Sequence, residues 1–228
     1  MNLANQRSVA AFTLIEMTVV ILIIATLAAL ITTAGSGVFE RARKVQAKND
    51  VTQIVTAVNA FYTEYGRYPV QLTNTNDAFF GTGAIPAGCT SYGNNDVLLD
   101  VLRDNTDSSG PNLATVNSLN PRQIPFLFPS GAKNTTPPRG GIALDRRYYD
   151  PWGSQYVVVI DTSYDNIITN PYSDTDGSAG TSPVRQGAIA YSFGKNGALG
   201  GGPKLNASFG DESGTAGTFK GSGDILSW

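Results

Sequence analysis

The stretch AAFTLIEMTVVILIIATLAALITTAG (10–35) is apolar almost without interruption. From Phe12 to Ala34 it holds about 23 residues, which as an α-helix measure roughly 34 Å, enough to cross a bilayer. One carboxylate, Glu16, interrupts the run near its start. Placing an ionisable residue inside a membrane-spanning apolar helix costs free energy, so we interpret Glu16 as functional. The sequence therefore predicts a membrane-spanning helix with a functional carboxylate near its beginning.

Two simpler interpretations compete with this one. A cleaved secretory signal peptide would have a shorter apolar region followed by a small-residue cleavage site. TTAGSG (32–37) is a poor cleavage site, and the helical pattern continues beyond it. The second interpretation concerns Glu16, which lies near enough to the helix start to reach the membrane interface without any role in assembly. Sequence position does not separate these two roles of Glu16.

Beyond the apolar run, the hydrophobic pattern becomes that of an amphipathic helix. No proline occurs before Pro69, so one helix can continue through both patterns, and Gly35 and Gly37 are the places where it would bend, melt or break. Gly66 is the expected left-handed cap. The predicted apolar face consists of Val51, Ile54, Val55, Val58, Phe61, Tyr62 and Tyr65.

The rest of the chain is rich in glycine and proline, which indicates a domain with many loops and a preference for β-structure. A short helix is expected at 96–105. Antiparallel pairing is expected between strands, because they are short and separated by turn-rich loops. No role is assigned to residues 70–140 or to Cys89. The expected strands lie at 155–160, 186–194 and 224–228.

Composition excludes several classes of function. Among 228 residues there is no histidine and one cysteine, so the chain cannot form a Ser-His-Asp or Cys-His catalytic site, a His- or Cys-rich zinc site or an intrachain disulfide. The net charge of −2 gives no basic character for binding nucleic acid. Scattered carboxylates in glycine-rich loops suit turns or metal ligands better than an acid/base pair. We therefore expect neither an enzyme nor a nucleic-acid-binding protein.

A polar leader, MNLANQRSVAA (1–11), is followed by FTLIE (12–16) and then by the apolar run. This order resembles the prepilin signature shared by type IV pilins and type II secretion pseudopilins. The resemblance implies that a prepilin peptidase cleaves between Ala11 and Phe12 on the cytoplasmic face, and that Phe12 is then N-methylated. Most family members have glycine before the cut, and alanine is small enough for the same pocket. Cleavage on the cytoplasmic face requires the N-terminus to lie in the cytoplasm. The positive-inside rule favours the opposite orientation, with the basic residues that follow the run in the cytoplasm.

Cleavage before Phe12 would explain the position of Glu16. The new N-terminus is a cationic amine, and in the low-dielectric core of a filament it needs an anion. Glu16 of a neighbouring subunit could supply that anion, whereas leaving either charge alone would cost several kcal/mol. Glu16 is therefore predicted to fix the register of assembly, with more effect on specificity than on stability.

Four later segments sharpen the resemblance to the major pseudopilin of type II secretion systems. They occur in the order GRYP (66–69), DPWGSQY (150–156), AYSFGKNG (190–197) and DILSW (224–228). The resemblance covers the first and last thirds of the chain. It implies an α+β pilin fold, in which a long N-terminal helix, with a membrane half and an amphipathic half, packs on a small C-terminal antiparallel β-sheet with long loops.

The resemblance also implies a division of the chain and a function. The parts are a leader (1–11), a transmembrane and assembly helix (12–35), its amphipathic continuation (36–68) and a globular domain (69–228). The implied function is that of a structural subunit that polymerises, after cleavage, into a helical pseudopilus driving type II protein secretion. The implied location is the bacterial inner membrane, with the domain and filament in the periplasm. The implied partners are further copies of the chain, minor pseudopilins or pilins, prepilin peptidase, an inner-membrane assembly platform and membrane lipid.

Three other functions compete with this one. The main alternative is the major subunit of a surface type IV pilus, located at the cell surface, which long filaments on cells would indicate. An enzyme anchored in the membrane is disfavoured by the absent histidine and the lack of a catalytic motif. A DNA-uptake pilin would need a basic groove with stacking aromatic residues, and the net charge is acidic.

Calcium is the one cofactor that the resemblance implies. Major pseudopilins hold their C-terminal loop with a calcium ion, and the matching positions here are the carbonyl of Phe193, Asn196 and Asp224. The family usually has aspartate where this chain has Asn196, and the lost negative charge weakens such a site. Asp211 and Glu212 are the residues that would compensate.

Two other oxygen-rich stretches offer weaker calcium ligands. In DTSYDN (161–166), Asp161 and Asp165 resemble the first half of an EF-type loop, but no glutamate follows at the twelfth position. In SDTDG (173–177), Asp174 and Asp176 are the candidates. The alternative for both stretches is an Asx-turn, since these residue types form turns without metal.

Overall fold

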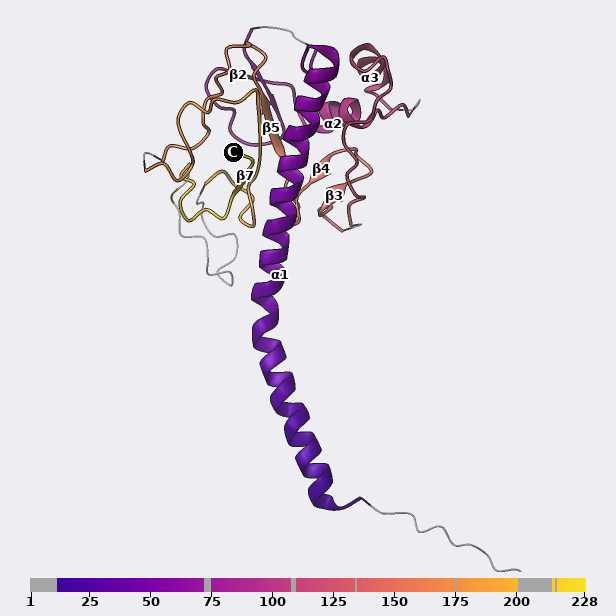
Figure 1. The fold of residues 1–228 in the computed structure, drawn as a ribbon, viewed down its shortest axis with the longest axis vertical. Coiled ribbons are helices and arrows are strands. Elements are labelled where there is room, and N and C mark those ends of the chain that lie inside the picture. Colours follow the sequence, from indigo (N-terminus) through magenta and orange to yellow (C-terminus); the bar gives the residue numbers. More distant parts are fainter. Residues whose placement is uncertain are drawn as a thin grey trace, which may run out of the picture. The chain divides into compact units, whose positions relative to one another are not determined.

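A computed structural model describes residues 12–71, 75–107, 110–133, 135–174, 176–200, 215 and 217–228, without the side chains of 30–36 (Figure 1). The chain divides into two compact units, Met1–Ala42 and Arg43–Trp228. Helix α1 (Leu14–Tyr65) contributes to both units. It continues through Gly35 and Gly37, so a break at these glycines is not observed.

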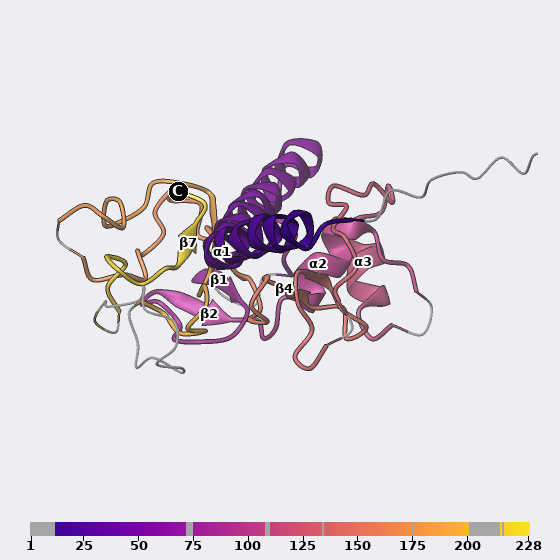
Figure 2. The ribbon, with the colours of Figure 1, turned by 90° about the horizontal axis from the view of Figure 1, so that it is seen from below.

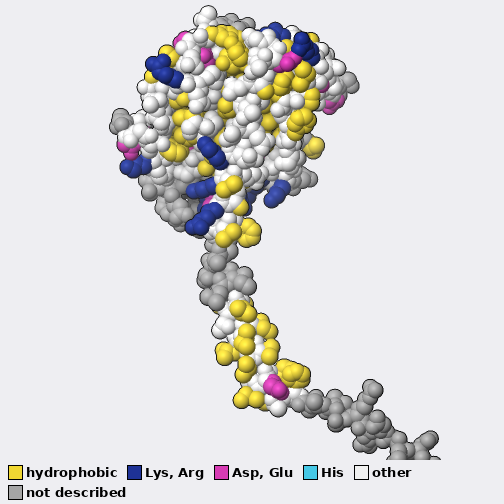
Figure 3. Space-filling view, in the orientation of Figure 1, with side chains coloured by type: hydrophobic (Ala, Val, Ile, Leu, Met, Phe, Trp, Pro, Cys, Tyr) yellow, Lys and Arg dark blue, Asp and Glu magenta, His cyan; other side chains and the backbone are white. Residues whose placement is uncertain are grey.

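In the first unit, the described residues form the first part of α1. Large apolar side chains are exposed along this part, as Figure 3 shows. They follow one another almost consecutively, so with 3.6 residues per turn they surround the helix instead of lining one face. A helix that is apolar all round needs cover from another surface. The exposed residues include Phe12, Leu14, Ile15, Met17, Val19, Val20, Ile21, Leu22, Ile23, Ile24 and Leu27.

The predicted membrane half of this helix is wrong. Among the side chains that the structure describes, which omit 30–36, no helix is both long and apolar enough to cross a membrane. By Glu40 and Arg41 the helix is charged. The inner-membrane location, which depended on a membrane-spanning helix, is wrong on the same finding.

The second unit begins with the remaining part of α1, and its predicted amphipathic character is confirmed. Of the predicted apolar face, Val55 is only partly buried and Tyr62 is 39% exposed. The helix ends as expected at Gly66, whose φ is +67° and whose N–H donates to the carbonyl of Tyr62 at 2.8 Å. The buried residues of this part are Ala47, Val51, Ile54, Ala57, Val58 and Phe61.

A five-stranded sheet has the order β2-β1-β5-β6-β7. β1 pairs with β2 in parallel, and the other neighbours are antiparallel. The predicted wholly antiparallel sheet is therefore wrong at this edge, although each predicted strand contains an observed one. The strands are β1 (Asp77–Phe80), β2 (Cys89–Ser91), β5 (Val157–Ile160), β6 (Ala188–Ser192) and β7 (Ile225–Leu226).

The remaining elements are two short helices and a small hairpin. Helix α2 (Asp96–Arg103) occupies the predicted 96–105, whereas α3 (Leu113–Leu119) was not predicted. β3 (Gly141–Ile142) and β4 (Tyr148–Tyr149) form a separate antiparallel pair. Within the second unit, α2, α3 and β4 lie to one side of α1 and β2 and β7 to the other, in both Figure 1 and Figure 2.

Both faces of the large sheet are covered, which explains why β5 is apolar at every position. Successive residues of a strand point to opposite faces. One face packs against α1 through Ala78, Phe80, Val158, Ile160, Ala188 and Ala190. The other face packs under the later loops through Phe79, Val157, Val159, Ile189 and Tyr191, together with Ile168, Tyr172, Phe193 and Leu226.

Two polar contacts connect α1 to this sheet. The hydroxyl of Tyr156 donates to Asp50 Oδ2 at 2.7 Å, and Lys48 Nζ donates to the carbonyl of Leu226 at 2.5 Å. Burial raises the pKa of Asp50, while the hydrogen bond from Tyr156 opposes that rise. The two contacts position the segment before β5 and the C-terminal strand relative to the second unit's part of α1.

Candidate functional site

Glu16 lies in the first turn of α1 and forms a reciprocal capping box with Thr13. The N–H and the hydroxyl of Thr13 each donate to Glu16 Oε2 at 2.8 Å, and the N–H of Glu16 donates to Thr13 Oγ1 at 3.3 Å. Hydrogen bonds from the backbone and then from the hydroxyl of Thr13 lower the pKa of Glu16. The carboxylate is therefore ionised and fixed in direction while it faces solvent. The T-x-x-E spacing before an apolar run is the sequence signal for this box, and the sequence interpretation missed Thr13.

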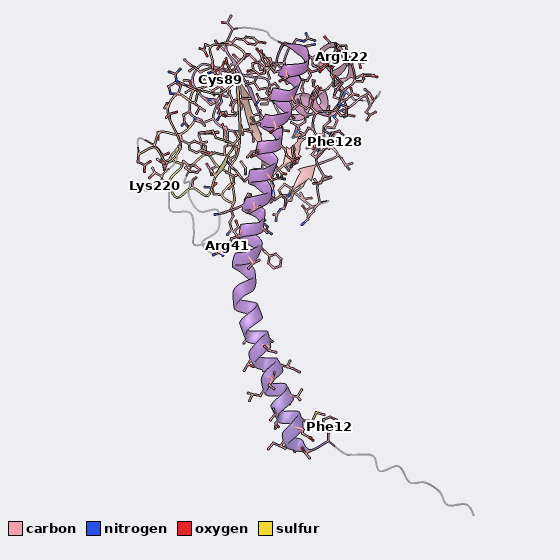
Figure 4. The ribbon with its side chains drawn as sticks, in the orientation of Figure 1. Phe12, Arg41, Cys89, Arg122, Phe128 and Lys220 are labelled. Atoms are coloured by element: carbon pink, nitrogen blue, oxygen red, sulfur yellow. The ribbon has the colours of Figure 1, made fainter. Side chains whose placement is uncertain are left out.

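Phe12 precedes the helix with 72% of its surface exposed and lies at the start of the described chain (Figure 4). Ala11, the other residue of the predicted cleavage site, lies outside the described residues. An amine created at Phe12 would be one residue from Thr13. The structure thus brings the predicted amine and Glu16 into the same short segment, where Glu16 is bonded to Thr13.

The DPWG segment forms a turn around the buried carboxylate of Asp150. Its Oδ1 accepts the backbone N–H groups of residues 152–154 at 2.7 to 2.9 Å. Its Oδ2 accepts the hydroxyl of Ser192 at 2.6 Å, and Ser192 Oγ in turn accepts the N–H of Gly194 at 3.0 Å. One carboxylate therefore joins the DPWG turn to the end of β6 and to the loop that holds Asn196.

The stability of the second unit is expected to depend on the protonation of Asp150. Burial raises its pKa from 3.8 to about 6, against the opposing hydrogen bonds of Ser192 and the 152–154 backbone. The folded unit thus binds this proton more tightly than the unfolded chain, so the linked stability is present below about pH 4 and is lost as the pH rises through about 6. Relative to Asp150→Asn, which does not titrate, the free energy of unfolding in urea should fall by roughly 3 kcal/mol across that range. A difference that does not change with pH would contradict this assignment.

The structure brings Asn196 and Asp224 together around Gly200. Asn196 Nδ2 donates to the carbonyl of Gly200 at 2.9 Å, and the N–H of Gly200 donates to Asp224 Oδ2 at 2.8 Å. The hydroxyl of Tyr172 donates to the same Oδ2 at 2.7 Å. Phe193 lies at the start of the same loop with its side chain buried. Tyr172 and Gly200 were missed from the sequence, where neither stands near a recognisable motif.

These hydrogen bonds bear on the predicted calcium site. Asp224 Oδ2 already accepts two protein donors, and Asn196 Oδ1 accepts the N–H of Ala198 at 3.1 Å. Asp211 and Glu212 lie outside the described residues. Among the residues described, no three Asp, Glu, His or Cys side chains gather closely enough to hold a metal ion.

The DTSYDN loop is organised by its own backbone. Asp161 Oδ2 accepts the N–H of Asn166 at 2.7 Å, and Oδ1 accepts the hydroxyl of Ser163 at 3.0 Å and the N–H of Asp165 at 3.3 Å. Asp165 Oδ1 accepts the N–H of Ile167 at 2.9 Å. The bond between Asp165 and Ile167 is an Asx-turn, whereas Asp161 spans the longer loop from 161 to 166.

Asp174 and Asp176 also bond to protein donors. Asp174 accepts the N–H groups of Phe219 and Lys220 and the hydroxyl of Ser178. Asp176 accepts the N–H of Ser178 at 3.0 Å and Lys220 Nζ at 3.1 Å. These contacts with Ser178 and Lys220 lower the pKa of Asp176 to about 2. The two carboxylates therefore attach the 174–178 turn to the segment before β7.

Cys89 lies in β2, and burial raises the pKa of its thiol to about 11. A thiol with so high a pKa stays protonated near neutral pH, so it has little nucleophilic character.

Comparisons of the chain with protein-family models, with characterised proteins and with solved structures found no match. The arrangement that bears most directly on function is therefore the exposed apolar helix with the capped carboxylate at its start.

Proposed function

We propose that this protein is a structural subunit that, after removal of residues 1–11, polymerises through its N-terminal helix into a helical pseudopilus of the kind that drives type II protein secretion. The observation that supports this most is the exposed apolar surface around the first part of α1. Such a surface is unfavourable in water. Other copies of the same helix present a matching apolar surface that can cover it.

Glu16 gives this association a defined register. Its carboxylate is ionised, exposed and aimed by Thr13. The amine of Phe12 on an incoming copy can donate to this carboxylate, so that both charges are paired when the helices come together. An apolar contact alone would allow the helices to slide, whereas an unpaired charge in the core would cost several kcal/mol.

The mature N-terminus and the assembly state test the proposal together. Protein from cells that also produce a prepilin peptidase should begin at Phe12 and have the added mass of one methyl group. The mature chain should form filaments visible by electron microscopy, whereas the uncleaved chain should not. A mature chain that begins elsewhere, or one that stays monomeric at high concentration, would contradict the proposal.

A surface type IV pilus remains the alternative assembly, because its subunits would use the same helix and the same carboxylate. Cells that express the gene at its native level distinguish the two. Long filaments outside the cell would indicate the pilus. Loss of protein secretion on deletion of the gene, without loss of surface filaments, would indicate the pseudopilus.

A calcium ion at the C-terminal loop stays a prediction, and thermal unfolding tests it. Binding through Asp224 should raise the melting temperature of chelator-treated protein by roughly 5 °C or more when calcium is about a hundredfold above its Kd. Asp224→Asn should abolish this increase, and Asp165→Asn is the matched control that should retain it. An unchanged melting temperature in the presence of calcium would rule out the ion.

A further inference from the structure

A groove of about 570 Å³ lies beside the small β3–β4 hairpin of the second unit. Its apolar walls include Pro138, Ile142 and Leu144. The side chain of Leu144 is fully exposed, and Phe128, three residues before the start of the groove-lining segment, is 77% exposed. Figure 4 shows Phe128 on the same side of α1 as β3 and β4. This side of the unit therefore presents apolar side chains without cover.

Two cations flank this groove. Lys133 and Arg139 stand opposite each other in a backbone bridge, in which the N–H of Lys133 donates to the carbonyl of Arg139 at 2.9 Å. Both are exposed, and neither makes an ion pair within the part of the chain that the structure describes. Like charges directly opposite one another are destabilising, so an anion placed between them would be favourable.

One acidic residue also lines the groove, but it has partners of its own. Asp145 Oδ2 accepts the hydroxyl of Tyr149 at 2.6 Å and lies 3.7 Å from Arg147 Nη1. Because Asp145 is paired in this way, Lys133 in the lining and its bridge partner Arg139 place positive charge beside the apolar walls. We call the surface formed by Pro138, Ile142, Leu144, Lys133 and Arg139 the basic groove.

A surface with exposed aromatic rings and a negative charge lies where α1 ends. The rings of Tyr62 and Tyr68 are 4.7 Å apart between centroids, and those of Tyr68 and Tyr164 are 5.4 Å apart and stacked. Tyr62 and Tyr164 are 39% and 50% exposed. Asp165 follows Tyr164 and is also exposed. We call Tyr62, Tyr68, Tyr164 and Asp165 the tyrosine ridge.

The ridge is held in shape by the loop that presents it. Tyr164 has φ +61°, a conformation that non-glycine residues rarely adopt. The carboxylate of Asp161 holds this conformation by accepting hydrogen bonds from Ser163, Asp165 and Asn166, on both sides of Tyr164. A nearby cation, Arg67, donates to the backbone carbonyls of 118–119. Because the loop is already ordered, docking through it would cost little conformational entropy.

From this complementarity we propose that the tyrosine ridge of one copy of the chain docks into the basic groove of a second copy. The ring of Tyr164 covers the apolar walls, and Asp165 lies between Lys133 and Arg139. Ridge and groove are different surfaces, so the contact is heterologous and adds copies in one direction instead of closing a dimer. The inference rests on the proposed function and adds a contact between the second units of neighbouring subunits.

Charge reversal in the full processed chain tests this contact. Asp165→Lys is expected to raise the concentration needed for assembly at least about tenfold, because three cations would then meet. Lys133→Glu combined with Arg139→Glu should do the same. A chain with all three changes should assemble near the wild-type concentration, since each copy then presents reversed but complementary charges. Arg185→Glu, which reverses an exposed cation outside both surfaces, is the matched control and should have little effect.

Cysteine cross-linking tests the geometry. In a Cys89→Ser background, oxidation of a mixture of Ser163→Cys and Ala143→Cys chains should give disulfide-linked dimers. Neither variant should give them alone, because a heterologous contact never places the same residue against itself. If charge reversal has no effect while assembly still depends on Glu16, the ridge–groove contact is wrong and the proposed function stands. If the wild-type chain does not assemble at all, both fail.

Discussion

Asp150→Ala is expected to lower the free energy of unfolding of the second unit by roughly 3 kcal/mol or more. The side chain is fully buried, and its two oxygens accept four hydrogen bonds from residues 152–154 and Ser192. Alanine would leave the N–H groups of Trp152 and Ser154 and the hydroxyl of Ser192 without this acceptor, which costs more than the hydrogen bonds themselves contribute. Urea unfolding at neutral pH, followed by the fluorescence of Trp152 and Trp228, measures the loss.

Asp150→Asn is the matched control for this change. The amide oxygen can still accept the N–H groups of 152–154, and the amide nitrogen can donate to Ser192 Oγ. Near neutral pH the carboxyl of wild-type Asp150 must ionise in a buried site, which is unfavourable. Asp150→Asn avoids this cost, so the variant should be at least as stable as the wild type. An alanine variant as stable as the asparagine variant would show that these hydrogen bonds do not hold the turn.

Glu16→Gln is expected to prevent assembly while it preserves the helix. Glutamine can still accept the N–H of Thr13, so the capping box is retained and only the charge is lost. A Phe12 amine buried without its anion would cost roughly 3 kcal/mol or more, which raises the concentration needed for assembly more than about a hundredfold. Sedimentation and electron microscopy of the mature chain measure assembly, and circular dichroism checks that helix content is unchanged.

Two further variants separate charge from capping. Glu16→Ala removes both and should fail to assemble as Glu16→Gln does. Thr13→Val removes the hydroxyl of the box but keeps the carboxylate, so this variant should still assemble. Normal filaments from Glu16→Gln together with none from Thr13→Val would mean that the cap, and not the charge pair, is what assembly requires.

Three of the segments that support the family resemblance, DPWGSQY, AYSFGKNG and DILSW, are joined by hydrogen bonds in the second unit. Asp150 of DPWG bonds to Ser192 of AYSFG, and Ser192 bonds to Gly194. The same loop reaches Asp224 of DILSW through Gly200. These motifs therefore describe one hydrogen-bonded structural unit. Their positions in sequence showed that they belong together, but the bonds that connect them are visible only in the fold.

Strong local patterns were enough to predict some elements. The apolar face of α1 repeats every three or four residues, and Gly66 with Pro69 ends it. The Val-rich run at 157–160 also predicted β5. By contrast, DAFF (77–80) is short, and both of its faces are buried, so no alternation of polar and apolar residues marks β1. β1 pairs with β2 in parallel, whereas an antiparallel sheet was expected.

Interactions within one or two helical turns could be read from the residues alone, because neighbours in the chain meet at fixed spacings whatever the rest of the molecule does. The α1 stripe was predicted in this way, and the T-x-x-E spacing of the Thr13–Glu16 box is of the same local kind although the sequence interpretation missed it. Contacts across long chain separations could not be read in that way. Asp150 and Ser192 are 42 residues apart, and Tyr172 and Asp224 are 52 apart. Which distant donor meets a buried carboxylate depends on how the sheet and loops pack together.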